Sequence, residues 1–323
     1  MQFASSRHLL ALLCSIAAAA AFAGCDGDST ESQPTAEPES FSLVFSAVLA
    51  GSDVACGADI PGVGPDGRHS VGVSDLRFYV SNLRFLDANG EEVEVTLDDN
   101  EFQLNSAAGS VALIDLTGNS GGSCEASAIA FAEGTARTNA VITGKTFPSQ
   151  VTSIAFDIGV PQSLMKEVIA NNTLEGAPTP LNEMYWSWAS GYRHFVFNFA
   201  VTDEAAESGG GYLHIGSRNC GPDDGLALAD RENCEFVNTP QFAADFNLAS
   251  DKVQLDLTAL VASVDLVAPI YDPMTFEVIG EGVGAECHSS PMQEDCASVF
   301  GVFGLSMDTG AADASKNQLF SVR

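Results

Sequence analysis

Apolar side chains alternate with polar ones along several separate stretches of the chain, and this pattern restricts the possible folds more than any other feature. Successive side chains of a β-strand point to opposite faces, so each stretch can bury one face of a strand and expose the other. Turn residues such as Asn89-Gly90 separate the stretches, as in β-hairpins. Many short amphipathic strands predict an all-β fold, a β-sandwich. The positions expected to share a face within each strand are Phe41, Leu43, Phe45, Ala47 and Leu49; Leu76, Phe78 and Val80; Val93, Val95 and Leu97; Ile154, Phe156, Ile158 and Val160; Phe195, Phe197, Phe199 and Val201; and Val253, Leu255 and Leu257.

A short helix is expected at residues 161–169, where Pro161 precedes apolar residues at helical spacing. The chain shows no convincing internal repeat, and its one clear change in composition lies near the N-terminus. We therefore expect one domain over residues 41–323, in which long loops are stapled by disulfides.

The N-terminus has the features of an export signal. Arg7 and His8 precede an apolar run over residues 9–23, which is shorter than the roughly 20 apolar residues of a membrane span. Ala23-Gly24-Cys25 directly follows and resembles a bacterial lipobox, which implies cleavage after residue 24 and acylation of Cys25. A plain secretory signal with an incidental cysteine is the alternative. Residues 25–40 are polar and contain two prolines, so they predict a disordered tether. We expect a lipid-anchored protein of the periplasm or cell envelope.

The chain is strongly acidic, with a formal net charge of −30 and only 13 Lys plus Arg. Phosphate groups would be repelled across most of such a surface, so nucleic acid is excluded as a partner. Contact with an anionic membrane is likewise limited to the lipid anchor. Solubility or adaptation to salt is the simpler explanation of the acidity itself.

An even number of cysteines remains for disulfides in the exported chain. Cys14 leaves with the signal and Cys25 takes the lipid. Proximity in sequence predicts the local pairs Cys220–Cys234 and Cys287–Cys296, each in a Gly-, Asp- or Ser-rich stretch, which leaves Cys56 and Cys124 for a long-range pair. None of the spacings is Cys-x-x-Cys, which argues against a zinc ribbon or a thioredoxin motif.

No catalytic motif stands out, and we expect a protein that is not an enzyme. Four histidines remain in the mature chain: His69, His194, His214 and His288. His194 alternates with the Phe row of its strand and is expected to face the surface. His214 lies on a strand just before Cys220, where it is either a rigidly held metal ligand or a structural histidine.

Both tryptophans of the protein lie in the run Met184-Tyr185-Trp186-Ser187-Trp188. In an extended conformation Met184, Trp186 and Trp188 would project to one face and place a thioether beside two indoles. A ridge of aromatic core residues is the simpler interpretation of the same pattern.

Six motifs recur in an order that resembles the MbnP-like proteins, the four-Cys-motif members of the metallo-mystery pair. They are Leu76-Arg77-Phe78-Tyr79-Val80-Ser81, Gly159-Val160-Pro161, Pro180-Leu181-Asn182, Met184-x-Trp186-x-Trp188-x-x-Gly191-Tyr192, His214-x-Gly216-Ser217 with Cys220, and Cys287…Cys296…Phe300-x-x-x-Gly304-Leu305. The resemblance covers nearly all of residues 41–323.

This resemblance implies a periplasmic copper-binding protein that is paired with a dihaem cytochrome c peroxidase-like (MbnH-like) partner. The partner oxidises a tryptophan to kynurenine, which then contributes to the copper site. By position, the modified residue is Trp186 or Trp188, and His214 is the main candidate ligand, with Met184 nearby.

The chain departs from the family pattern at two positions. Many relatives have Asn-His where Met165-Lys166 stand here, and His288 follows Cys287 where a Met is more usual. The resemblance therefore implies either that Met165 or His288 substitutes in the ligand set or that the copper site is weakened. Two functions without metal stay open: a structural or adhesive exported domain, and a carbohydrate-binding module that uses Trp186 and Trp188 as a stacking platform.

Overall fold

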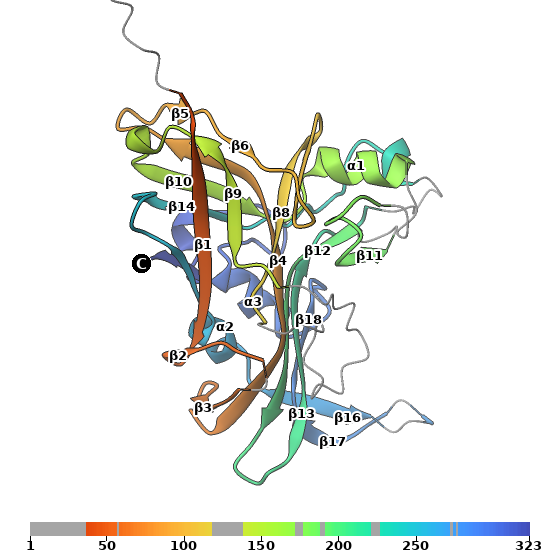
Figure 1. Ribbon diagram of the computed structural model, residues 1–323. Coiled ribbons are helices and arrows are strands. Elements are labelled where there is room, and N and C mark those ends of the chain that lie inside the picture. The colour runs from red at the N-terminus through yellow and green to blue at the C-terminus, as the bar shows by residue number, and fades with distance from the viewer. Residues whose placement is uncertain are drawn as a thin grey trace, which may run out of the picture. The chain divides into compact units, whose positions relative to one another are not determined.

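In the computed structural model, residues 37–323 are described except for 57, 118–137, 172–176, 188–190, 221–226, 272–273 and 276. Residues Glu37–Arg323 form one compact unit made mainly of strands (Figure 1). The signal sequence, residues 25–36 of the expected tether (Cys25 among them), Cys124 and Trp188 lie outside the described residues, whereas Glu39 and Ser40, also expected in the tether, already belong to β1 (Glu39–Leu49). Within the described part of the chain, no helix has the length and apolar character that spanning a bilayer requires.

The smaller sheet has six strands, and β1 is its centre. Its order is β19 (Phe320–Val322), β15 (Val253–Asp256), β1 (Glu39–Leu49), β9 (Val141–Thr146) and β6 (Thr96–Leu97), with β2 (Ser52–Asp53) also on β1. β1 runs parallel to β15 and antiparallel to β9.

The larger sheet has eleven strands. Its main order is β14 (Gln241–Asp245), β10 (Ser153–Ile158), β4 (His69–Leu86), β12 (Gly191–Thr202), β13 (Ser208–Gly216) and β18 (Ala285–His288). β3 (Asp59–Val63), β5 (Glu92–Val93) and β8 (Gly109–Asp115) pair with β4, β7 (Gln103–Ser106) pairs with β8, and β11 (Tyr185–Ser187) pairs with β12. β16 (Val267–Tyr271) and β17 (Val278–Val283) form a separate two-stranded ribbon.

In the described part of the chain, three α-helices accompany the sheets: α1 (Gln162–Asn171), α2 (Thr258–Ala262) and α3 (Cys296–Val302). The helix expected at 161–169 is α1, displaced by one or two residues; α2 and α3 are too short to produce a clear helical period in the sequence. Short 3₁₀ segments lie at Pro148–Gln150, Leu228–Asp230 and Ala314–Lys316.

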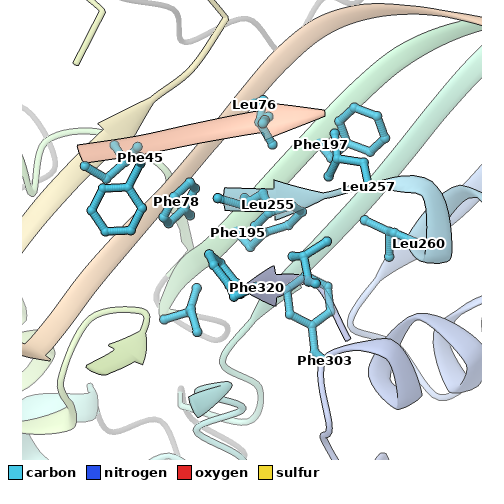
Figure 2. Packing of buried hydrophobic residues seen from close by; sticks show 14 of the residues in the cluster. Phe45, Leu76, Phe78, Phe195, Phe197, Leu255, Leu257, Leu260, Phe303 and Phe320 are labelled. Atoms are coloured by element: carbon cyan, nitrogen blue, oxygen red, sulfur yellow. The ribbon is translucent and has the colours of Figure 1, made fainter. Parts of the chain in front are cut away.

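The main core lies between the two sheets, and most of the predicted alternating residues form it. Figure 2 shows Phe45 of β1, Phe78 of β4, Phe195 of β12, Leu255 of β15 and Phe320 of β19 gathered in one cluster. Burial of each large apolar side chain contributes about 1.5–3 kcal/mol relative to exposure. The β-sandwich prediction is therefore confirmed.

A second hydrophobic cluster covers the other face of the larger sheet. It is built from Leu164, Met165, Val168 and Ile169 of α1 and from Tyr79, Val160, Met184 and Tyr192, among others. Val160 was expected beside Ile158 in the main core, which is wrong: β10 ends at Ile158, and Gly159 has a φ of +141° that redirects the chain.

Because this face is covered, the expectation that His194 faces solvent is also wrong. His194 is fully buried: its Nδ1 accepts the Val160 N–H at 3.2 Å and its Nε2 donates to Val237 O at 2.9 Å. A Cβ on Gly159 would lie 2.6 Å from the His194 ring, so the glycine is required there. Burial lowers the pKa of His194 to about 4, and the ring is a neutral structural group.

The strand expected at 93–97 is divided between the two sheets. Val93 lies on β5, which pairs with β4, whereas Leu97 lies on β6, which pairs with β9. Both side chains are still buried in the main core. The alternation therefore identified the buried positions correctly but not the change of sheet.

Both predicted local disulfides are present, Cys220–Cys234 and Cys287–Cys296. Cys56 is also disulfide-bonded. Cys124 lies outside the described residues, so the pairing Cys56–Cys124 stays a prediction.

Candidate metal centre

Two histidines that are far apart in sequence lie side by side on the larger sheet. β13 and β18 pair in parallel, and the register places His214 opposite His288. Ser289 secures this pairing, because its Oγ donates to His214 O and accepts the Gly216 N–H. The Cys287–Cys296 disulfide fixes β18 to α3 directly beside His288. The histidine pair is thus held by backbone structure on both strands.

The hydrogen bonds around the pair direct two ring nitrogens at each other. His214 Nε2 lies 2.7 Å from Asn198 Oδ1, which can only accept, so His214 carries its proton on Nε2. Its Nδ1 lone pair then faces His288 Nδ1 at 2.9 Å. The two ring centroids are 4.7 Å apart. Without a metal, a hydrogen bond across this distance needs the proton of His288 on Nδ1, whereas the contact of His288 Nε2 with Glu286 Oε1 at 3.1 Å needs it on Nε2, so the neutral ring has one proton for two contacts.

Both imidazoles favour the neutral form, which is the form that binds metals. Burial, followed by the charges of His288 and Arg193, holds the pKa of His214 well below its usual range. Burial also lowers the pKa of His288, although the nearby Glu286 carboxylate partly opposes this. Glu286 Oε1 lies 3.1 Å from His288 Nε2, and the His288 side chain is 27% exposed, whereas His214 is buried. The pair therefore has one buried and one accessible member.

Two aromatic side chains, Trp186 and Tyr212, lie close to both histidine rings. Its ring centroid lies 6.4 Å from that of His214 and 5.9 Å from that of His288, and Tyr212 lies 6.5 and 6.1 Å from the same two rings. A Cβ on Gly216 would lie 3.3 Å from Trp186 Cε3 and 2.6 Å from Tyr192 O. The glycine of the His-x-Gly-Ser motif thus leaves room for the indole.

The loop that leads to Trp186 is anchored by side chains of β4 and β12. Tyr79 Oη donates to Pro180 O and Glu183 O, and Tyr192 Oη donates to Leu181 O. Arg77 adds a buried ion pair with Glu183 at 3.3 Å. The motif Leu76–Ser81 therefore contacts the motif Pro180–Asn182. Together they position the neighbouring motif from Met184 to Tyr192, which contains Trp186.

Buried charges lie beside the histidines on the same face of the sheet. Arg77 forms a bidentate pair with Asp75, which is the register neighbour of Asn198, the residue that holds His214. Asp75, Glu183 and Asp115 raise the pKa of Arg77 above its usual value against the opposing effect of burial. Burial raises the pKa of Asp115 to about 6. This network keeps the Asn198 environment polar and rigid.

The sequence-predicted residues are thus only partly brought together. His214, His288 and Trp186 meet. Met165 lies on the buried face of α1, with its sulfur 3.7 Å from Ser217 Oγ, and Met184 is buried in the same second cluster. The expectation of an extended Met184–Trp186 face is wrong, because Met184 has a φ of +49° and precedes the strand.

Three neighbours of the pair were not identified from the sequence: Asn198, Tyr212 and Glu286. Asn198 alternates with Phe197 and Phe199, a pattern that marks a polar face but not its function. The fourth histidine, His69, is not part of this site: its Nδ1 lies 3.6 Å from Asp66 Oδ1. Among the described residues, no group of three or more His, Cys, Asp or Glu side chains is arranged to hold a metal ion.

Comparisons with known proteins agree with the motifs. A model of the MbnP family matches residues 38–275. Among solved structures, MbnP from Methylosinus trichosporium is similar with a TM-score of 0.62 and 23% sequence identity, over 89% of this chain and 99% of that one. No curated protein sequence matches. Since the family model covers most of the chain, the family resemblance inferred from the motifs is confirmed, and the chain belongs to the MbnP family.

Proposed function

We propose that this protein is an exported, lipid-anchored copper-binding protein, not itself an enzyme, whose site is built on His214 and His288 and completed by oxidation of Trp186 to kynurenine. One observation carries the proposal: two neutral imidazoles direct their Nδ1 atoms at each other across 2.9 Å, with one indole against both rings. Membership of the MbnP family, whose relatives are associated with copper and methanobactin, supports the choice of metal.

The donor set fits copper. Two metal–nitrogen bonds of about 2.0 Å each can span up to about 4 Å, so nitrogens 2.9 Å apart are within reach of one ion. Imidazole is a good ligand for copper, which exceeds the other divalent first-row metals in affinity for such sites. A bound copper ion would offer Lewis-acid and one-electron redox chemistry. Here the protein contributes His214 and His288 as ligands and Asn198 as the acceptor that orients His214.

Trp186 is the described side chain best placed to provide the missing donor. Oxidative cleavage of the indole C2–C3 bond adds an oxygen atom at each of these carbons, and C2 then leaves as formate on hydrolysis. The product, kynurenine, carries an aniline nitrogen and a ketone oxygen that indole lacks. The oxidation removes four electrons, and a dihaem peroxidase-like partner would pass them to two molecules of hydrogen peroxide, which are reduced to water. Trp186 is half-buried at the accessible His288 side of the pair, where oxidising equivalents from a partner can reach it.

Lipid attachment through Cys25 is part of this proposal, because the polar segment before β1 would then let the folded domain meet a partner in the same compartment. Cys25→Ser is expected to release the mature protein from membranes or to leave it unprocessed. Fractionation of cells tests this, and a Ser variant that partitions and migrates like wild type contradicts lipid anchoring.

The modification is tested by expression with and without the dihaem partner, followed by peptide mass spectrometry. With the partner, one tryptophan is expected to lose one carbon and gain one oxygen. Trp186→Phe should abolish the conversion, because phenylalanine has no indole ring to cleave, whereas the matched control Trp188→Phe should retain it. Conversion of Trp188 in the Trp186→Phe variant, at the wild-type yield, would show that Trp186 is not the target.

The ligand set is tested on the modified protein by competition with a copper chelator. His214→Ala and His288→Ala should each weaken copper binding without preventing kynurenine formation, and Met165→Leu and Met184→Leu should change affinity little. His69→Ala is the control for adventitious binding to an exposed acidic surface. An unmodified protein that binds copper as tightly as the modified one contradicts the whole mechanism.

A further inference from the structure

Exposed apolar side chains are concentrated in one region beside the histidine pair. Among the described residues, every exposed large hydrophobic side chain except Val44 lies between residues 267 and 292. Val267 and Val278 of the β16–β17 ribbon are 50% and 60% exposed, and Met292 of the loop before α3 is 91% exposed. Contiguous exposed apolar surface of this kind marks an interaction site more often than scattered single residues do.

These three side chains line one groove of 520 Å³. One wall is the ribbon, with Val267, Pro269 and Val278, and the other is the loop that carries Met292. The ribbon pairs with no other strand of the described chain, and a two-stranded hairpin is only marginally stable by itself. The chain thus exposes an apolar ribbon whose contribution to the main core is small.

The rim of the groove is acidic. Its lining residues include five carboxylates and no Lys or Arg: Asp265, Glu281, Glu286, Glu294 and Asp295. Burial and the nearby carboxylates of Asp265, Glu294 and Glu286 raise the pKa of Asp295. Carboxylates held this close favour a partner that brings positive charge to the rim.

The groove is continuous with the metal centre through β18. Glu286 lines the groove and also contacts His288 Nε2 at 3.1 Å. The His288 ring is in turn 5.9 Å from Trp186 between centroids. A protein seated in the groove would therefore contact the accessible side of the histidine pair, next to the side chain that must be oxidised.

We propose that this groove is the docking surface for the haem-bearing oxidising partner, which inserts an apolar segment flanked by basic residues between Val278 and Met292. The proposal rests on the proposed function and names the surface that the partner uses. A second copy of this chain is a poor occupant, because a chain with a formal charge of −30 would place acidic surface against the acidic rim.

Binding of the purified dihaem peroxidase-type protein to the mature, unmodified chain tests this docking surface by calorimetry at low and high salt. Val278→Ala combined with Met292→Ala removes the apolar contact, and Glu281→Gln combined with Glu294→Gln removes rim charge. The matched controls are Val44→Ala, also an exposed valine, and Glu92→Gln combined with Glu94→Gln, also exposed acids. All positions are exposed, and thermal unfolding confirms that each variant is folded.

We expect each groove variant to weaken partner binding by about tenfold or more, with controls within about twofold. The Glu281/Glu294 variant should also lose most of the salt dependence of binding. Equal binding of groove and control variants overturns the proposal, as does a wild-type chain that does not bind the partner. Self-association that the groove variants abolish also overturns it, in favour of a second copy. Kynurenine formation is measured separately: bound but unconverted wild type refutes the proposed function and leaves the docking surface supported.

Discussion

Replacement of Asn198 by alanine is expected to weaken copper binding although Asn198 is not a ligand. Asn198 Oδ1 accepts the His214 Nε2–H at 2.7 Å and thereby keeps the lone pair of His214 on Nδ1, facing His288. Both residues are almost completely buried, at 1% and 2% exposure, so bulk water is not available to replace the lost acceptor. In Asn198→Ala the ring can place its proton on Nδ1 instead, which blocks the donor atom.

Two magnitudes follow from this geometry. A buried N–H without a partner costs about 1–3 kcal/mol, so the metal-free variant should lose that much free energy of unfolding. Loss of the group that orients a metal-binding histidine reduces metal affinity by about 10–100-fold. At 25 °C this corresponds to about 1.4–2.7 kcal/mol of binding free energy.

The tautomer itself can be observed without copper. Nitrogen-15 NMR of the imidazole side chains distinguishes protonated from unprotonated ring nitrogens, and wild-type His214 should carry its proton on Nε2. Affinity is then measured by chelator competition on the kynurenine-bearing protein. Asn139→Ala is the control, because Asn139 donates to Leu113 O away from the histidines and its loss should lower stability but not affinity.

Two results would refute this reasoning. One is a wild-type His214 that is protonated on Nδ1. The other is an Asn198→Ala variant that keeps wild-type copper affinity while Asn139→Ala behaves as expected. Either result would mean that Asn198 only fills space beside His214.

The remaining predictions concern stability. The pKa of buried His194 is about 4, against about 6.5 when unfolded, so the unfolded chain binds more protons below pH 6.5 and stability is lost as the pH falls from 6.5 toward 4. When denaturant unfolding at pH 7 and pH 4.5 is compared, His194→Gln should lack about 2.4 kcal/mol of that loss, and identical pH profiles would contradict this prediction. Gly159→Ala should lower the free energy of unfolding by at least about 1–3 kcal/mol, because a Cβ would lie 2.6 Å from the His194 ring and φ at this position is +141°. An unchanged denaturant midpoint would show that the loop relaxes around the added methyl group. Replacing Cys220 and Cys234 together by serine opens a link with a sequence separation of 14 and should lower the free energy of unfolding by about 3 kcal/mol relative to oxidised wild type. Denaturant unfolding measures this loss, and a double variant as stable as oxidised wild type would contradict it.

Local sequence patterns are enough to assign the fold class and most of the buried positions. Alternation is a local property, so Phe41 to Leu49, Leu76 to Val80 and Phe195 to Val201 could be assigned to a common buried face without knowledge of their neighbours. Short loops likewise made the two confirmed disulfides predictable, because cysteines 9 and 14 residues apart are close in any compact chain. The order of the motifs was sufficient to indicate the MbnP family.

Tertiary structure alone decided which of these residues form the candidate site. His214 and His288 meet because β13 and β18 pair in parallel with one particular register, and periodicity within a strand contains no information about its neighbours or their register. The same limit explains the misplacement of His194: alternation shows that it lies opposite the phenylalanines, but only the packing of α1 and its neighbours on that face makes the position buried. Asn198 orients His214, which lies 16 residues later in the sequence. The two side chains meet because β12 pairs with β13.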